Sequence, residues 1–134
     1  MMGGLGTGRR MLRLTAQYAD IWNLVAQFDP AETDRYAFYQ SRHALLDAAC
    51  EMAGRDPATL TRSVVDNVNS LNHPGYMTAQ GIPVLRGSPA DIAEAFARYR
   101  DLGVEHLIVN PLPLSVEAVE AMAPVLEVLG RGEA

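Results

Sequence analysis

Residues 1–24, MMGGLGTGRRMLRLTAQYADIWNL, place a glycine cluster, a helical pattern and a short apolar stretch in direct succession. The helical pattern covers residues 9–19, and residues 21–24 read as a buried strand. A glycine-rich turn that opens a helix leaves backbone N–H groups accessible at the positive end of the helix dipole. The stretch therefore predicts an anion site, and the obvious anion is a phosphate supported by Arg9 or Arg10. The glycines are Gly3, Gly4, Gly6 and Gly8.

The spacing of these glycines matches neither of two familiar phosphate-binding patterns. It is not the G-x-G-x-x-G of dinucleotide folds, and the lysine of a P-loop is missing. A flexible N-terminal lead-in is the alternative interpretation of the same residues.

The rest of the chain alternates helices with short strands. Helices are predicted from a cap at Thr33 or Asp34 to about residue 53, from Ser88 to Gly103, and from Ser115 to about residue 129. Strands are predicted at residues 61–65 and 105–109, with an extended piece at 82–87 and a loop at 66–81. Such alternation favours βα units on a parallel sheet, in a single α/β domain over residues 1–134.

Composition and charge exclude several classes of protein. The chain has 134 residues, a net charge of −5 and no dense basic patch, so we expect no nucleic-acid partner. No apolar run is long enough to span a bilayer, and no signal peptide is visible. The single Cys50 fits a reducing cytoplasm and reads as a small buried residue. His43, His73 and His106 lack metal-ligand spacing, so no metal site is predicted.

Three segments, in family order, resemble the luciferase-like monooxygenases, a superfamily of flavin-dependent monooxygenases and deazaflavin (F420)-dependent oxidoreductases. Residues 3–23, GGLGTGRRMLRLTAQYADIWN, are similar to its GG-x-G-x-R…Y-A-D-G-W-N segment, with Ile21 where the family usually has glycine. Residues 50–63, CEMAGRDPATLTRS, and residues 86–111, RGSPADIAEAFARYRDLGVEHLIVNP, resemble two later segments. The family's N-terminal half has no counterpart in this sequence.

The resemblance implies a fold, a cofactor and a reaction class. The family fold is a (β/α)8 barrel of about 250 residues, so the chain would supply roughly its C-terminal half, beginning at the phosphate turn without the preceding strand. The cofactor would be F420 or FMN, acting on a small organic substrate. Its phosphate would be held by Gly3, Gly4, Gly6, Thr7 and Arg9. The resemblance assigns no catalytic acid or base.

Other residues carry weaker expectations. His73 and Tyr76 make the loop at 66–81 the most plausible substrate-facing segment, and Asn110 ends a strand where a cofactor or substrate contact is possible. Besides an oxidoreductase, the sequence leaves open a non-catalytic phosphate- or nucleotide-binding βα module and a self-associating half-barrel interaction protein. Because a half-barrel exposes an open sheet, we expect a homo-oligomer.

Overall fold

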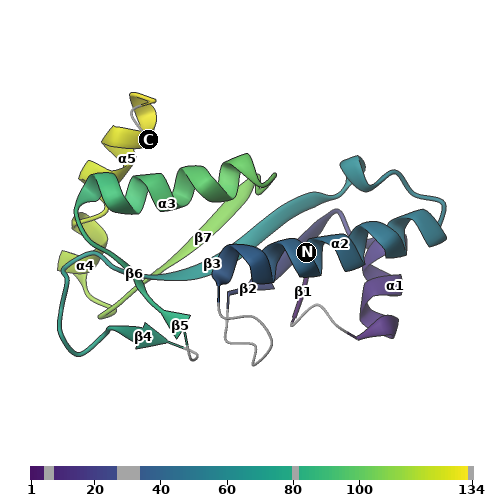
Figure 1. The fold of residues 1–134 in the computed structure, drawn as a ribbon, viewed down its shortest axis with the longest axis horizontal. Helices are drawn as coiled ribbons and strands as arrows, with labels where there is room; N and C mark the ends of the chain where they lie inside the picture. The colour runs from purple at the N-terminus through teal and green to yellow at the C-terminus, as the bar shows by residue number, and fades with distance from the viewer. Residues whose placement is uncertain (5–7, 27–33, 80–81, 133–134) are drawn as a thin grey trace.

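The computed structural model describes residues 1–4, 8–26, 34–79 and 82–132. Its main sheet runs β1-β2-β3, with β7 on the other side of β3 and the short β6 added near the end of β3. Every pairing in this sheet is parallel, which confirms the predicted parallel α/β fold (Figure 1). The elements are β1 Met2–Gly4, α1 Arg9–Tyr18, β2 Ile21–Val25, α2 Arg35–Met52, η1 Pro57–Thr59, β3 Thr61–Asn69, β4 Thr78–Ala79, β5 Ile82–Pro83, β6 Leu85–Arg86, α3 Pro89–Asp101, β7 His106–Pro111, α4 Val116–Glu120 and α5 Ala123–Gly130.

Helices α2, α3 and α4 begin where short polar side chains cap them. Asp34 accepts hydrogen bonds from the backbone N–H groups of Tyr36 and Ala37 at the start of α2. Ser88 and Asp91 form a reciprocal capping box at the start of α3, as the sequence predicts. Ser115 caps α4 through the N–H of Ala118. These bonds satisfy donors that the first helical turn leaves open.

Helices α1, α2 and α3 cover one face of the sheet. Trp22 and Leu24 of β2 and Val64 of β3 share a buried cluster with side chains of these three helices. A second cluster joins Val68 to α3, Met122 and α5. Alternation along a strand sends successive side chains to opposite faces, so the even-numbered residues of β3 face the helices and the odd-numbered ones face the other side. We call that other side the open face.

Three predictions about the strands need correction. Residues 2–4 form β1, so a strand does precede the glycine-rich segment. Strand β3 runs to Asn69, four residues beyond its predicted end, because Asp66–Val68 pair with Val109–Pro111 of β7. The apolar residues of the predicted strand at 105–109 indicate burial on both faces, but the side chains of β7 are half-buried or exposed, since within the described chain only one of its edges is paired.

The helical period of the sequence places Met11 and Tyr18, Leu45 and Met52, and Val119 and Leu126 on buried faces, with the last pair on one helix kinked at Pro124. The structure differs for all three helices. Leu45 and Met52 of α2 are exposed, and the buried side of that helix carries Tyr36, Phe38, Tyr39, Leu46 and Cys50 instead. Met11 and Tyr18 of α1 are exposed as well. The last helix is not one kinked helix. It divides into α4 and α5, with Pro124 in the first turn of α5, and this turns Val119 and Leu126 outward while Ala118, Met122 and Val125 are buried.

Candidate functional site

The glycine-rich segment joins the carboxyl end of β1 to the start of α1. Gly3 and Gly4 lie in β1, where they pair with Asn23 and Leu24 of β2. Gly6 and Thr7 fall outside the described residues. Gly8 is the N-cap of α1, and Arg9 is the first helical residue, with an exposed side chain. The segment between strand and helix is therefore residues 5–8.

The start of α1 differs from the other long helices in its polar groups. Unlike α2 and α3, it has no side-chain cap among the described residues, and its first turn holds no acidic residue. Two arginines, Arg9 and Arg10, stand there instead. Positive side chains at the positive end of a helix dipole are unfavourable unless an anion compensates them. Uncapped N–H donors and two guanidinium groups together can bind a phosphate or carboxylate.

The carboxyl ends of the parallel strands carry an amide pair on the open face. Asn67 of β3 and Asn110 of β7 are register partners. The Asn110 amide donates to the Asn67 side-chain oxygen over 2.7 Å. Asn67 is buried, whereas Asn110 is exposed. The sequence singled out Asn110 but missed Asn67, although polar side chains at 63, 67 and 69 follow the two-residue period of a strand with one polar face.

A second polar row crosses three strands nearer their amino ends. The Ser63 hydroxyl lies 2.9 Å from the Asn23 side-chain oxygen and 3.2 Å from Nδ1 of His106. If the Ser63 hydroxyl donates its one proton to the Asn23 oxygen, then Nδ1 of His106 must donate to the Ser63 oxygen. Ser63 is fully buried, so it cannot act as a nucleophile toward a substrate in solution. The sequence predicts His106 to be a hydrogen-bonded residue in the core or at the rim of a strand, and in the structure it is exposed and hydrogen-bonded on β7.

The open face carries no carboxylate from strands β2, β3 and β7. The one acidic residue in these strands, Asp66, points to the helix side. It accepts hydrogen bonds from Arg35 over 2.7 and 2.8 Å and from the Tyr99 hydroxyl over 2.7 Å. Burial raises the pKa of Tyr99, and the Asp66 charge adds to this, so the hydroxyl stays protonated and donates. This cluster ties α2 and α3 to β3 and is structural.

The loop that was expected to face a substrate is organised around Asn69. Its amide donates to the carbonyl groups of His73 and Tyr76, and its oxygen accepts from the His73 N–H. The His73 and Tyr76 rings meet edge to face, with centroids 5.3 Å apart, and both are exposed. The loop is thus anchored by a fully buried asparagine at the end of β3.

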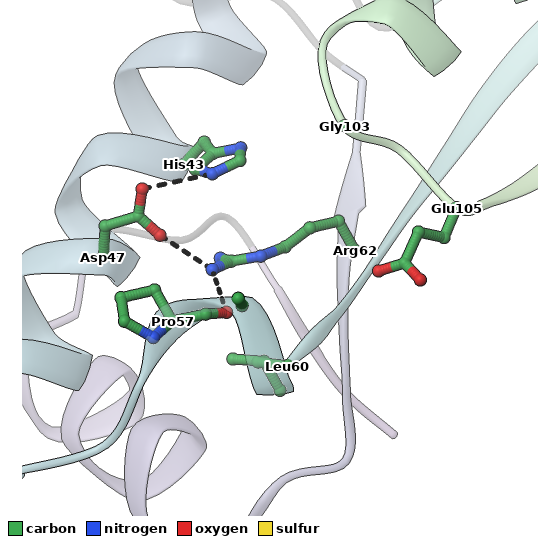
Figure 2. A pocket seen from close by; sticks show the side chains of 8 residues that line it. His43, Asp47, Pro57, Leu60, Arg62, Gly103 and Glu105 are labelled. Atoms are coloured by element: carbon green, nitrogen blue, oxygen red, sulfur yellow. Dashed lines mark hydrogen bonds and ion pairs between the residues drawn. The ribbon is translucent and has the colours of Figure 1, made fainter.

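A small pocket of about 270 Å3 lies at the opposite, amino end of the strands (Figure 2). Arg62 extends from β3 and binds Asp47 of α2 over 2.7 Å, and it also donates to the Pro57 carbonyl over 3.1 Å. Nε2 of His43 lies 3.1 Å from the other Asp47 oxygen. Arg62 is only 4% exposed, and its Nη1 is buried without a hydrogen-bond partner among the described residues. In barrel enzymes this end of the strands serves stability and the carboxyl end carries the site.

Three remaining sequence predictions concern metals, membranes and the cysteine. The described residues contain no cluster of three or more histidine, cysteine or acidic side chains that could hold a metal ion. In the same part of the chain, every helix is too short or too polar to cross a bilayer. Cys50 is fully buried, as expected, and burial raises the pKa of its thiol.

Comparison with known proteins finds likeness in structure only. No family model matches the sequence, and no curated protein matches it. An F420-dependent secondary alcohol dehydrogenase, solved with an F420–acetone adduct, superposes with a TM-score of 0.61 at 11% identity. The coenzyme F420-dependent tetrahydromethanopterin reductase from Methanopyrus kandleri gives 0.60 at 10% identity. In both cases the match covers 92% of this chain and 47% of the other.

These superpositions establish the fold. The chain spans about half the length of the solved enzymes it matches. Its parallel strands with helices on one face correspond to βα units of their barrels. The chain therefore has the fold of roughly the C-terminal half of a (β/α)8 barrel like those of F420-dependent enzymes.

Proposed function

We propose that this chain is the cofactor-phosphate-binding portion of an F420-dependent oxidoreductase of the luciferase-like superfamily. The observation that carries the proposal is the uncapped, arginine-bearing start of α1, directly after the carboxyl end of a parallel strand. Barrel enzymes place their phosphate sites at this end of the strands. The two solved structures of like fold are both F420-dependent enzymes by name.

The residues present fit an anionic cofactor. The first turn of α1 offers backbone N–H donors that no side chain in the described part of the chain caps, and Arg9 adds a positive charge. Among the residues that the structure describes, a Cβ atom at Gly8 would meet only Met11, at 3.8 Å, so these residues do not crowd the helix start. Gly4, Gly6 and Thr7 would complete the phosphate site, with Gly3 in the strand before it. These residues bind and orient the cofactor, and the cofactor itself supplies two-electron transfer to or from a small organic substrate.

F420 is the preferred cofactor, because both named neighbours use it. FMN, and with it a monooxygenase reaction, is the alternative that the sequence resemblance leaves open. The single buried cysteine suits a reducing compartment, so we place the protein in the cytoplasm.

Titration of the purified chain with F420, followed by cofactor fluorescence, tests the proposal. Arg9→Glu should weaken binding about tenfold, which corresponds to about 1.4 kcal/mol, because it removes a cation and places a like charge near the phosphate. Gly6→Val should weaken it too, by blocking backbone approach. Arg100→Glu on α3 is the matched control, since it makes the same charge change at another exposed arginine.

Competition with inorganic phosphate tests the location of the site, and a parallel titration with FMN tests the choice of cofactor. Inorganic phosphate should compete with F420 for the wild-type chain and much less for Arg9→Glu. Equal losses in Arg9→Glu and Arg100→Glu would show a nonspecific charge effect and remove the site from α1. Tighter binding of FMN than of F420 would reassign the cofactor.

A non-catalytic phosphate-binding module is the second candidate. It is favoured by one observation: the open-face side chains of β2, β3 and β7 include amides, a serine and a histidine but no carboxylate. Such a module would bind ADP or inorganic phosphate as well as F420. Selective binding of F420 over ADP would argue against it.

A further inference from the structure

Each end of the main sheet has an unpaired strand edge in the described part of the chain. Strand β1 pairs only with β2, and β7 pairs only with β3. Figure 1 shows α1 toward one end of the molecule and α4 and α5 at the other. Exposed edges of a parallel sheet are normally paired or covered.

An apolar stripe runs along α1 beside the β1 edge. Met11, Leu14 and Tyr18 are spaced by three and four residues and so share one side of the helix. This side differs from the buried one and from the side that forms a groove with α2, which carries Arg9, Arg13 and Gln17 and extends to Arg10. Tyr18 is 75% exposed and Met11 43%. We call Met11, Leu14 and Tyr18 the α1 stripe.

Exposed apolar side chains also lie on the two helices that follow β7, and one of them, Leu126, lines a pocket with Leu107 and Val109 of that strand. Val116 and Val119 of α4 and Leu126 of α5 are each more than half exposed. We call these three residues the C-terminal patch. Glu117, Glu120 and Glu127 surround it and are exposed. The α1 stripe is bordered instead by Arg10, and Arg9 and Arg13 lie on the same helix. The two surfaces are thus both apolar and opposite in charge.

Edge-to-edge pairing would bring these two surfaces together. If β7 of one copy pairs in parallel with β1 of another, the helices that follow the two strands become neighbours on the outside of the sheet, as in any barrel of βα units. Applied twice about a two-fold axis, this pairing joins two sets of four strands into a closed ring of eight. No sheet edge then remains exposed.

We propose that two copies of this chain form a two-fold dimer in which β7 and the C-terminal patch of each copy dock on β1 and the α1 stripe of the other. Arg10, which borders the α1 stripe, then comes near the glutamates around the patch. The open-face rows of Asn23, Ser63 and His106 and of Asn67 and Asn110 come to line a shared interior. The proposal does not depend on which cofactor the chain binds.

Sedimentation velocity of the full chain across a concentration series tests the dimer. Wild type should sediment as a dimer at micromolar concentration. Tyr18→Asp and Val119→Asp each place a charge in the interface and should each weaken association about tenfold or more. Met52→Asp is the matched control, because Met52 is 90% exposed and lies outside both surfaces, in the groove between α1 and α2.

A charge exchange tests which surfaces meet. Arg10→Glu and Glu120→Arg should each weaken the dimer, and the double variant should recover much of the loss. A monodisperse wild-type monomer would overturn the proposal, as would a dimer weakened by Met52→Asp or by only one of Tyr18→Asp and Val119→Asp. The proposal would also fail if the wild-type chain stayed monomeric and instead bound a separate polypeptide that carries four further barrel strands. That polypeptide, and not a second copy, would then pair with the two sheet edges.

Discussion

The Tyr39 hydroxyl lies 2.8 Å from Nδ1 of His43, one turn further along α2, while Nε2 of the same ring lies 3.1 Å from Asp47. A neutral imidazole satisfies both contacts, with Nδ1 accepting from Tyr39 and Nε2 donating to Asp47. Protonation of Nδ1 would leave the hydroxyl proton of a buried tyrosine without this acceptor. Burial lowers the pKa of His43, the Arg62 charge lowers it further, and Asp47 partly opposes both.

This geometry predicts a loss of stability on mild acidification. Because the pKa of His43 is lower in the folded chain than its ordinary value of 6.5, the folded state binds the proton more weakly than the unfolded state does. The stability that neutral His43 contributes to the folded state is complete above pH 6.5, and it is lost as the pH falls through the pKa of His43 in the folded chain. Urea unfolding at about pH 7.5 and pH 5.5 should show a larger drop for wild type than for His43→Gln. Equal drops in the two proteins would contradict the assignment to His43.

Asp66 is predicted to be the most sensitive polar residue of the core. It is 1% exposed and holds Arg35 of α2 and Tyr99 of α3. Asp66→Asn leaves the largely buried Arg35 guanidinium uncompensated and should cost about 3–5 kcal/mol of unfolding free energy. Tyr99→Phe, which removes only a hydroxyl, should cost about 1–3 kcal/mol. Denaturant unfolding measures both, and a smaller loss for Asp66→Asn than for Tyr99→Phe would show that the ion pair contributes little.

Asp66 also shows why part of the fold escaped sequence reasoning. Residues 66–69, DNVN, have turn-forming side chains and so predicted a loop. In the structure each polar side chain of this segment finds a partner: Asp66 binds Arg35, Asn67 binds Asn110, and Asn69 binds the following loop. These partners lie on α2, on β7 and in the following loop, and such tertiary contacts override local preference.

Capping signals, in contrast, act within a few residues and were readable from the sequence. Asp34, Ser88 with Asp91, and Ser115 all cap helices as expected. Helix faces were less readable, because an apolar residue such as Met52 satisfies the helical period whether or not another element covers it. The site prediction depended on glycine placement, and the structure adds the amide pair, which only strand register brings together.

The capping box of α3 should make a measurable contribution to stability. The Ser88 hydroxyl accepts from the Asp91 N–H over 3.2 Å, and the Asp91 carboxylate accepts from the Ser88 N–H over 2.7 Å. Ser88→Ala should therefore cost about 1 kcal/mol of unfolding free energy. Gly87→Ala is expected to lower the free energy of unfolding further than Ser88→Ala does. Gly87 has a φ of +117°, and a Cβ added there would lie 2.7 Å from an Asp91 carboxylate oxygen. Thermal unfolding can rank the two variants, and the reverse order would contradict this account of the turn.

The last prediction concerns catalysis by the chain itself. The strands of the described sheet present amides, Ser63 and His106 on the open face, and their one carboxylate, Asp66, is engaged on the other side. Ser63 is fully buried and hydrogen-bonded, so it offers no exposed proton donor or acceptor to a substrate. A two-electron transfer from a bound cofactor needs a positioned group to handle the substrate proton, and among these side chains His106 is the remaining candidate. We therefore expect F420 binding without appreciable turnover of a secondary alcohol, followed as the change in cofactor absorbance. His106→Gln should leave both the binding and the low rate unchanged. Robust turnover by wild type that His106→Gln abolishes would instead make His106 a catalytic residue and this chain an enzyme without further strands.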